Sequence, residues 1–201
     1  MKKQSGIKLR NLVDRATNLK IKDSVVLAAF SGFLGGVAMD ISNAFLWRVG
    51  KSEVLYGHLG GSVFMKAFRT NRAKNFFLGQ IFHWTTSAAL AIPFFHFLKH
   101  TGKDHHLFKG GVWGLFIWAT LYNGGQRVGL YKAKPHLSKS HYAAIWHNVL
   151  YGLATSWLMV RCADPSLFDK RIENPETMVS IRNHLTTENN EERIQEIPAF
   201  H

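Results

Sequence analysis

The sequence predicts an all-α fold: a four-span transmembrane helical bundle with an N-terminal amphipathic surface helix and a soluble C-terminal tail. The first observation behind this prediction is that four stretches, at about 24–47, 75–98, 108–126 and 141–161, are long and almost free of charge. A span needs about 20 apolar residues to cross about 30 Å of hydrocarbon, where charged side chains are costly. The second is that small residues recur at four-residue spacing inside these stretches, which is typical of helices that pack together in lipid.

The first two stretches are the longest. Residues 24–47 carry one acidic side chain, Asp40, and residues 75–98 contain no Lys, Arg, Asp or Glu, with Pro93 as a candidate kink. The connection between them, 48–74, is half apolar in its middle. There, four apolar side chains fit one face of a short interfacial or re-entrant helix: Leu55, Leu59, Val63 and Phe64.

The last two stretches are shorter. Residues 108–126 are rich in glycine, and residues 141–161 end at Arg161, just before an Asp-Pro dipeptide. A helix does not readily continue into the residue before a proline, so the fourth span should stop there.

Segments on either side of the four-helix transmembrane domain, 24–162, have opposite charge. The leader, 1–23, is basic and has apolar residues at helical spacing, so it is either an amphipathic helix on the membrane surface or a solvated basic segment. The tail, 163–201, is acidic and polar and contains no stretch long enough to span. We expect it to be a cytoplasmic appendage.

The charge of the chain favours a membrane partner. The 201 residues have a formal net charge of +12, and the basic residues flank the apolar stretches. We therefore expect anionic lipid at the basic leader, and no nucleic acid, as a partner. With both termini in the cytoplasm, 15 Lys/Arg lie inside and 10 outside, which favours that orientation.

Small residues on each span predict how the helices pack. Residues four apart lie on one helix face, and glycine allows two helix backbones to approach closely. We expect the following residues to face neighbouring helices: Gly32, Gly36, Gly79, Gly110, Gly114 and Gly152.

The few polar residues of the spans should meet near one membrane face. Asp40 comes late in the first span, while His83 and His147 come early in the second and fourth, so alternating direction puts all three roughly 10–12 Å below the same interface. The other polar residues expected at this end are Asn123, Gln126, Arg127 and Asn148. A carboxylate in lipid must be paired or protonated, so Asp40 should contact Arg127, His83 or His147.

Three interpretations of this polar cluster remain open. It can be a structural lock that fixes the bundle. It can handle protons, because histidine changes charge near neutral pH. It can also bind a metal, since His83, His147 and Asp40 are a known ligand combination. These three residues come from different helices without a local ligand motif, so no metal and no cofactor is expected.

Four segments resemble the YagU-type family of small bacterial inner-membrane proteins, over about residues 25–165. They are AAFSGFLGGV (Ala28–Val37), GQIFHW (Gly79–Trp84), LFKGGVWGLF (Leu107–Phe116) and IWHNVLYGLATSW (Ile145–Trp157). The resemblance implies a multi-pass protein of the bacterial inner membrane with a role in acid tolerance, and it implies no catalytic residues. Asp40 and Arg127 have no counterpart in that pattern, and the leader and tail lie outside it.

The sequence therefore leads to three hypotheses of function. The first is a proton-responsive role in acid tolerance, in which the intramembrane His/Asp cluster titrates. The second is a small oligomeric transporter or channel for protons, metal ions or small solutes. The third is an assembly subunit with a purely structural polar core, which binds other membrane helices or a second copy of itself. No reaction-specific motif indicates an enzyme.

Overall fold

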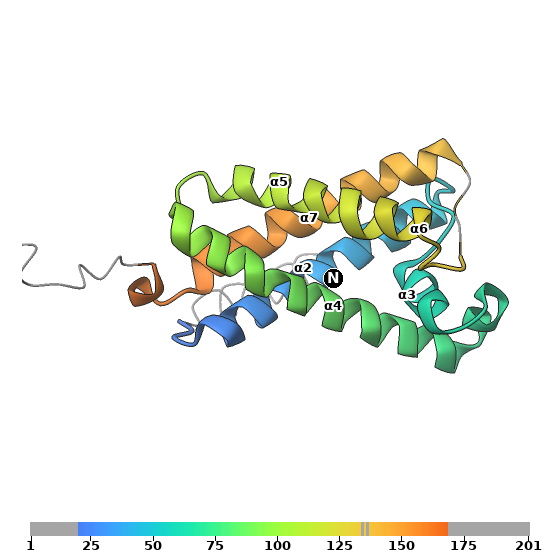
Figure 1. Ribbon diagram of the computed structural model, residues 1–201, viewed down its shortest axis with the longest axis horizontal. Coiled ribbons are helices and arrows are strands. Elements are labelled where there is room, and N and C mark those ends of the chain that lie inside the picture. The colour runs from blue at the N-terminus through green and yellow to red at the C-terminus, as the bar shows by residue number, and fades with distance from the viewer. Residues whose placement is uncertain (1–19, 134, 136, 169–201) are drawn as a thin grey trace, which may run out of the picture. The chain divides into compact units, whose positions relative to one another are not determined.

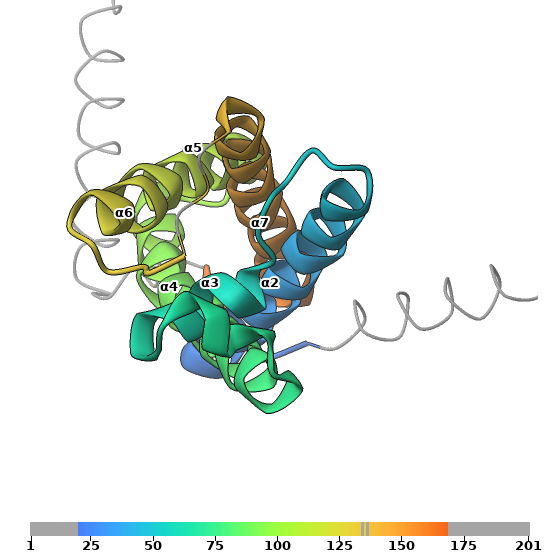
Figure 2. The same ribbon diagram turned by 90° about the vertical axis from the view of Figure 1, so that its right-hand side faces the viewer.

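The computed structural model describes residues 20–133, 135 and 137–168. These residues form a bundle of helical segments with a short helix across one end (Figures 1 and 2). No strand occurs among them, so the all-α prediction is confirmed for this part of the chain. Most of the predicted leader (1–19) and tail (169–201) lies outside the described residues. The elements in chain order are α2 (Ser24–Arg48), α3 (Tyr56–Phe64), the 3₁₀ helix η1 (Ala67–Asn71), α4 (Ala73–Thr101), α5 (His106–Ile117), the π-helix η2 (Trp118–Gly124), α6 (Gly125–Arg127), α7 (Ser138–Cys162) and the 3₁₀ helix η3 (Pro165–Leu167).

The observed helices are slightly longer than the predicted stretches, and polar side chains complete two of the helix ends. Asp23 caps α2 by accepting hydrogen bonds from the backbone N–H groups of Val25 and Val26, both at 2.8 Å. At the end of α4, Lys109 Nζ donates to the carbonyl oxygens of Thr101 and Gly102, at 3.0 and 2.8 Å. These orphan carbonyls gain both a donor and a positive charge.

The third predicted stretch is helical but not uniform. α5, η2 and α6 follow one another without a break from His106 to Arg127, and the middle segment, Trp118–Gly124, is a π-helix. A π-helix has a wider turn than an α-helix, so side chains beyond it point in directions that a 3.6-residue period does not predict.

Two helices, α2 and α4, are long and apolar enough to cross a membrane by length and composition. Only 39% of the apolar window of α2 and 28% of that of α4 is buried inside the protein. Large apolar side chains therefore lie on the outside of both helices, as they also do on α5 and α7.

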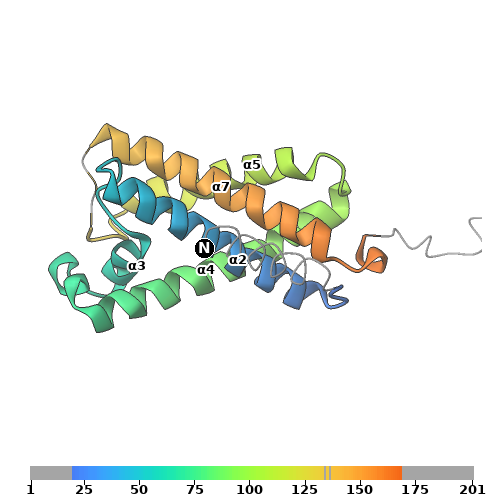
Figure 3. The ribbon, with the colours of Figure 1, turned by 180° about the vertical axis from the view of Figure 1, so that it is seen from behind.

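The long helices pack in the order α4, α2, α7, α5 (Figures 2 and 3). α2 lies between α4 and α7, and α5 packs along α7. α5 follows α4 in the chain but barely contacts it. The short helix α3 packs against the N-terminal part of α4, at the end of the bundle where α2 ends and α7 begins.

All six glycines singled out in the sequence lie where helices contact each other closely. A Cβ atom on Gly32 would lie 2.5 Å from the carbonyl oxygen of Ser87, and one on Gly36 would lie 2.9 Å from the Ser87 side chain. Gly79 meets the backbone of Gly57 and Gly61 on α3. The contact between α5 and α7 is made in the same way, by the backbones around Gly110, Gly114 and Gly152.

The buried core differs between the two ends of the bundle. At the end near the described termini it is mainly apolar and includes Leu27, Phe94, Phe95, Leu98 and Met159. At the α3 end it includes four tyrosines: Tyr56, Tyr122, Tyr131 and Tyr151. Polar groups are therefore tolerated at the α3 end, where the predicted polar cluster lies.

We expect Gly110→Ala to destabilise the protein by about 1–3 kcal/mol, because the new Cβ would overlap the carbonyl group of Gly152. Gly111→Ala is the matched control, since a Cβ there would meet only Leu153, at 3.9 Å. Thermal unfolding of the purified protein measures both. Equal melting temperatures for the two variants would show that this helix contact does not limit stability.

Candidate functional site

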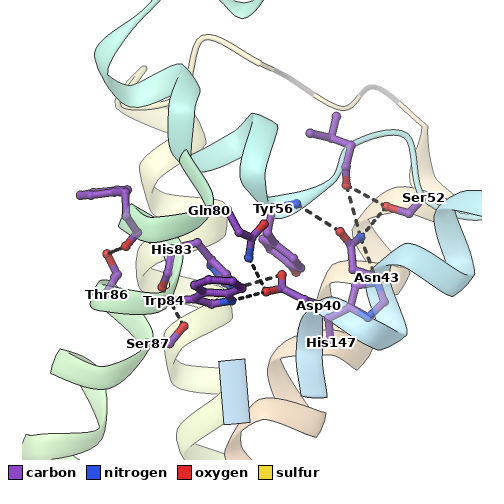
Figure 4. Close-up of polar contacts among 12 residues, drawn as sticks. Asp40, Asn43, Ser52, Tyr56, Gln80, His83, Trp84, Thr86, Ser87 and His147 are labelled. Atoms are coloured by element: carbon purple, nitrogen blue, oxygen red, sulfur yellow. Dashed lines mark hydrogen bonds and ion pairs between the residues drawn. The ribbon is translucent and has the colours of Figure 1, made fainter. Parts of the chain in front are cut away.

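Asp40 and His83 contact each other between α2 and α4, and they form an ion pair when the imidazole is protonated. The Nε2 atom of His83 lies 3.3 Å from Oδ1 of Asp40, without the alignment of a hydrogen bond. The other carboxylate oxygen, Oδ2, accepts a hydrogen bond from Trp84 Nε1 at 2.7 Å and another from Gln80 Nε2 (Figure 4). The side chains of Asp40 and His83 are 20% and 13% exposed. Each carboxylate oxygen thus faces at least one polar partner on α4.

Helix geometry explains why three partners of Asp40 come from α4. His83 and Trp84 follow Gln80 by three and four residues, so each lies next to Gln80 on the surface of the helix. One turn further along, Ser87 contacts Gly36, which is itself one turn from Asp40 on α2. The close helix contact therefore sets the register that brings the carboxylate to this face.

Tyr56, at the start of α3, lies between the two predicted histidines. Its ring stacks on His83 with 4.8 Å between ring centroids and 11° between the planes. The same ring meets His147 edge-on at 6.0 Å. The backbone N–H of Tyr56 donates to Asn43 Oδ1 at 3.1 Å, which ties this end of α3 to α2.

His147 belongs to a second polar group, centred on Asn43. The Nδ2 atom of Asn43 donates to Ser52 Oγ at 3.1 Å and to the carbonyl oxygen of Val54 at 3.3 Å, and it lies 3.4 Å from Nε2 of His147. The Tyr56 N–H and the Val54 C=O fix the orientation of the amide, so Nδ2 can only donate and Nε2 of His147 can only accept from it. The two N–H groups of Nδ2 are thus shared among three acceptors. The other ring nitrogen, Nδ1, then donates to Ser42 Oγ at 3.2 Å. A neutral imidazole satisfies all these contacts.

Glu53 attaches the same loop to the start of α7. Its Oε2 atom accepts hydrogen bonds from the backbone N–H of Leu137 and from Ser140 Oγ, both at 2.9 Å, and Ser140 Oγ accepts from the Glu53 N–H at 3.2 Å. A carboxylate at a helix N-terminus satisfies an orphan donor and interacts favourably with the helix dipole. The loop between α2 and α3 is thereby fixed to both α2 and α7.

A chamber lies beside His83, and residues of α2, α3, α4, α5, η2 and α7 line it. Its volume is about 70 Å³. Its polar lining includes His83, Thr86, Asn148 and four tyrosines, and its apolar lining includes Met39, Leu59, Leu90 and Ile117. Burial, and to a lesser extent Tyr122, raises the pKa of Tyr131 to about 12, so its hydroxyl stays protonated and donates to the carbonyl oxygen of Leu121 at 3.2 Å.

The structure separates the predicted cluster into different environments. Asp40 and His83 are paired, and Asn148 lines the chamber while its Nδ2 atom donates to the Ala144 carbonyl at 2.8 Å. His147 does not contact Asp40 but joins the Asn43 group, as described above. Asn123 is half-buried in η2, and Gln126 has a buried Nε2 atom without a hydrogen-bond partner.

Of the three partners expected for Asp40, the structure shows His83 in contact with it. Arg127 is exposed at the end of α6, and the carboxylate accepts hydrogen bonds from donors one helix turn apart on α4. The π-helix before Arg127 changes the direction in which the end of this segment points. A shared metal site is also not formed, since no three His, Cys, Asp or Glu side chains converge anywhere in the described part of the chain.

Sequence reasoning missed four residues of the site: Asn43, Tyr56, Gln80 and Trp84. Gln80 precedes His83 by three residues and Trp84 follows it directly. Both could have been recognised as donors once a carboxylate was expected to face His83. Asn43 lies three residues after Asp40 on an otherwise apolar span. Nothing in the sequence pattern indicated Tyr56, because its position depends on how α3 packs against α4.

Comparisons with protein-family models, with curated proteins and with solved structures found no match to this chain. The site is therefore interpreted from its own geometry.

Asn43→Ala should lower the free energy of unfolding by about 2–3 kcal/mol, since it leaves the buried Tyr56 N–H without its acceptor and removes one of the two donors to the Val54 carbonyl. Ser42→Ala, on the adjacent position, removes only hydroxyl contacts with His147 and Trp146 and should cost less. Chemical or thermal unfolding compares the two. An Asn43→Ala variant as stable as Ser42→Ala would contradict a central role for this amide.

Proposed function

We propose that the chain is a multi-pass membrane protein in which α2, α4, the α5–η2–α6 segment and α7 each cross the bilayer. Large apolar side chains on the outside of these helices support this topology, because a water-soluble protein rarely exposes so much apolar surface. Charges support it as well: Lys109 and Arg127 lie at the ends of the third segment, and Lys139 and Arg161 at the ends of α7.

Within this membrane protein, the Asp40–His83 pair is the group that responds to protons. The observation that carries the proposal is the 3.3 Å contact between two ionisable side chains on helices that otherwise bear charge only near their ends. The pair holds one proton either as an ion pair or as two neutral groups. A second proton makes it positively charged in apolar surroundings, which is costly.

Protonation of the pair would be transmitted to the helix contact. Gln80 and Trp84 donate to the Asp40 carboxylate, and both bonds are stronger to the anion than to the acid. Loss of the anion therefore weakens three contacts between α2 and α4 together. The nearby tyrosines do not compete for the proton, since phenols remain protonated at neutral and acid pH.

The biological role that fits this chemistry is a response to acid in the bacterial inner membrane, with both termini in the cytoplasm. The excess of Lys/Arg on the side of the termini supports the orientation. The resemblance to the YagU-type family, and not the structure, supports the link to acid tolerance.

A second candidate function, passage of a small solute or of protons, is favoured by the chamber beside His83. The chamber does not continue through the bundle, because Phe94, Phe95 and Met159 fill the core at the other end. Transport would therefore require either a conformational change or several copies of the chain.

If protonation of the pair weakens the contact between α2 and α4, the melting temperature should fall as the pH is lowered from about 8 to about 4. Asp40→Asn and His83→Gln should each flatten this fall, because each variant removes one of the two groups that take up protons. His96→Gln is the control: His96 is on the same helix but exposed, so this variant should keep the wild-type profile. The measurement is thermal unfolding in lipid nanodiscs. Identical profiles for wild type, Asp40→Asn and His83→Gln would refute the proposed role of the pair.

The proposed topology predicts that the two ends of the bundle face opposite compartments. In a Cys162→Ser background, Lys51→Cys should react with a membrane-impermeant thiol reagent added outside intact cells. Lys103→Cys, in the loop between α4 and α5, should react only after the membrane is opened. Equal labelling of both positions in intact cells would exclude this arrangement.

A further inference from the structure

A second, smaller cavity lies between the chamber and the loops at the α3 end of the bundle. Its volume is about 10 Å³. It is lined by loop residues that include Ser52, Val54 and Pro135, and by His147 of α7. Three residues line both cavities: Tyr56, Leu59 and Tyr122. The two cavities are therefore neighbours, separated by these three side chains.

We propose that the two cavities form one aqueous path from the α3 end of the bundle to the Asp40–His83 pair, with Tyr56 as the barrier between them. This inference rests on the proposed membrane function and adds the route by which water and protons reach the pair. The ligand of both cavities is water, and the ion that it carries is the hydrated proton.

Size and polarity of the two cavities agree with water as their occupant. A water molecule needs roughly 10–15 Å³ of accessible space and two to four polar partners. The smaller cavity meets the lower limit and offers Asn43, Ser52, Ser140 and His147. The chamber has room for several molecules and offers hydroxyl, amide and imidazole groups. A purely apolar lining would leave such spaces dry.

The position of Tyr56 makes it the dividing residue. One of its neighbours, His147, lines only the smaller cavity, and the other, His83, lines only the chamber. The ring contacts both histidines, so a rotation of this one side chain opens or closes the space between them. At the far end of the chamber, Tyr151 OH donates to the Ser87 carbonyl at 2.6 Å, and the apolar core lies beyond. Water is therefore not expected to reach His83 from the apolar end of the bundle.

Neighbouring threonines on α4 provide a direct test. Thr86 lines the chamber, whereas Thr85 is exposed on the outer surface of the same turn and would face lipid. Each is replaced by cysteine in a Cys162→Ser background, and Ag⁺, an ion close to water in size that reacts with thiols, is added to proteoliposomes. Thiols that remain free are then counted with a maleimide after denaturation.

Thr86→Cys should react with Ag⁺ at least about tenfold faster than Thr85→Cys, because an ion enters a hydrated cavity more readily than hydrocarbon. Equally slow reaction at both positions overturns the path but leaves the membrane topology intact. Reaction of Thr85→Cys as fast as Lys51→Cys in the exposed loop overturns the membrane placement itself, and with it the proposed function.

Removal of the barrier should speed the reaction in the chamber. Adding Tyr56→Ala to Thr86→Cys should raise its Ag⁺ rate by about tenfold, because a buried ring is replaced by open space. Phe64→Ala, at an exposed position of the same helix, should leave the rate unchanged. Tyr56→Leu, which preserves more of the buried volume, gives the same comparison if Tyr56→Ala does not fold. An unchanged rate in the folded variant shows that Tyr56 is not the barrier.

Discussion

The close contact between α2 and α4 determines where the Asp40–His83 pair lies. Gly36 and Asp40 are one turn apart on α2, and Ser87 and His83 are one turn apart on α4. The two helices run in opposite directions, so contact between Gly36 and Ser87 in one turn brings Asp40 to His83 in the next. A side chain larger than hydrogen at position 36 would separate the helices, and the carboxylate would lose its partners. The glycine that lets the two helices pack closely is therefore also required for the contact between Asp40 and His83.

His147 and His83 differ in their capacity to exchange protons, because they contact different polar groups. His147 faces an amide N–H and a hydroxyl, which together satisfy the neutral imidazole and leave it no acidic partner. His83 faces a carboxylate, which can give or take a proton. Such differences are large because few water molecules can reach either ring, so a missing protein partner is only partly replaced. One histidine therefore fixes the loop before α3, while the other is available for proton exchange.

Much of the helical framework could be predicted from the sequence, and less of the site. Charge-free stretches and glycines at four-residue spacing gave the helices and the residues at their contacts, because both depend on local periodicity. Depth along antiparallel helices predicted that Asp40 and His83 lie at one level, but it left the partner of Asp40 open among three residues. Arg127 could not be placed correctly, since the π-helix before it changes the period. Tyr56 was missed because its position depends on contact between Gly79 and the α3 backbone, which is a tertiary feature.

The chamber is a consequence of which helices pair closely. Close contacts at glycines hold α5 against α7 and α4 against α2. α4 and α5 therefore make few contacts with each other, although they are neighbours in the chain. The π-helix η2 then places Leu121 and Tyr122 along the remaining space, and α3 covers its end with Tyr56 and Leu59. Side chains of tyrosine fill such a space incompletely and bring hydroxyl groups into it. The same small-residue contacts that pack the bundle tightly on two sides therefore leave a polar space on the third, directly beside the contact between Asp40 and His83.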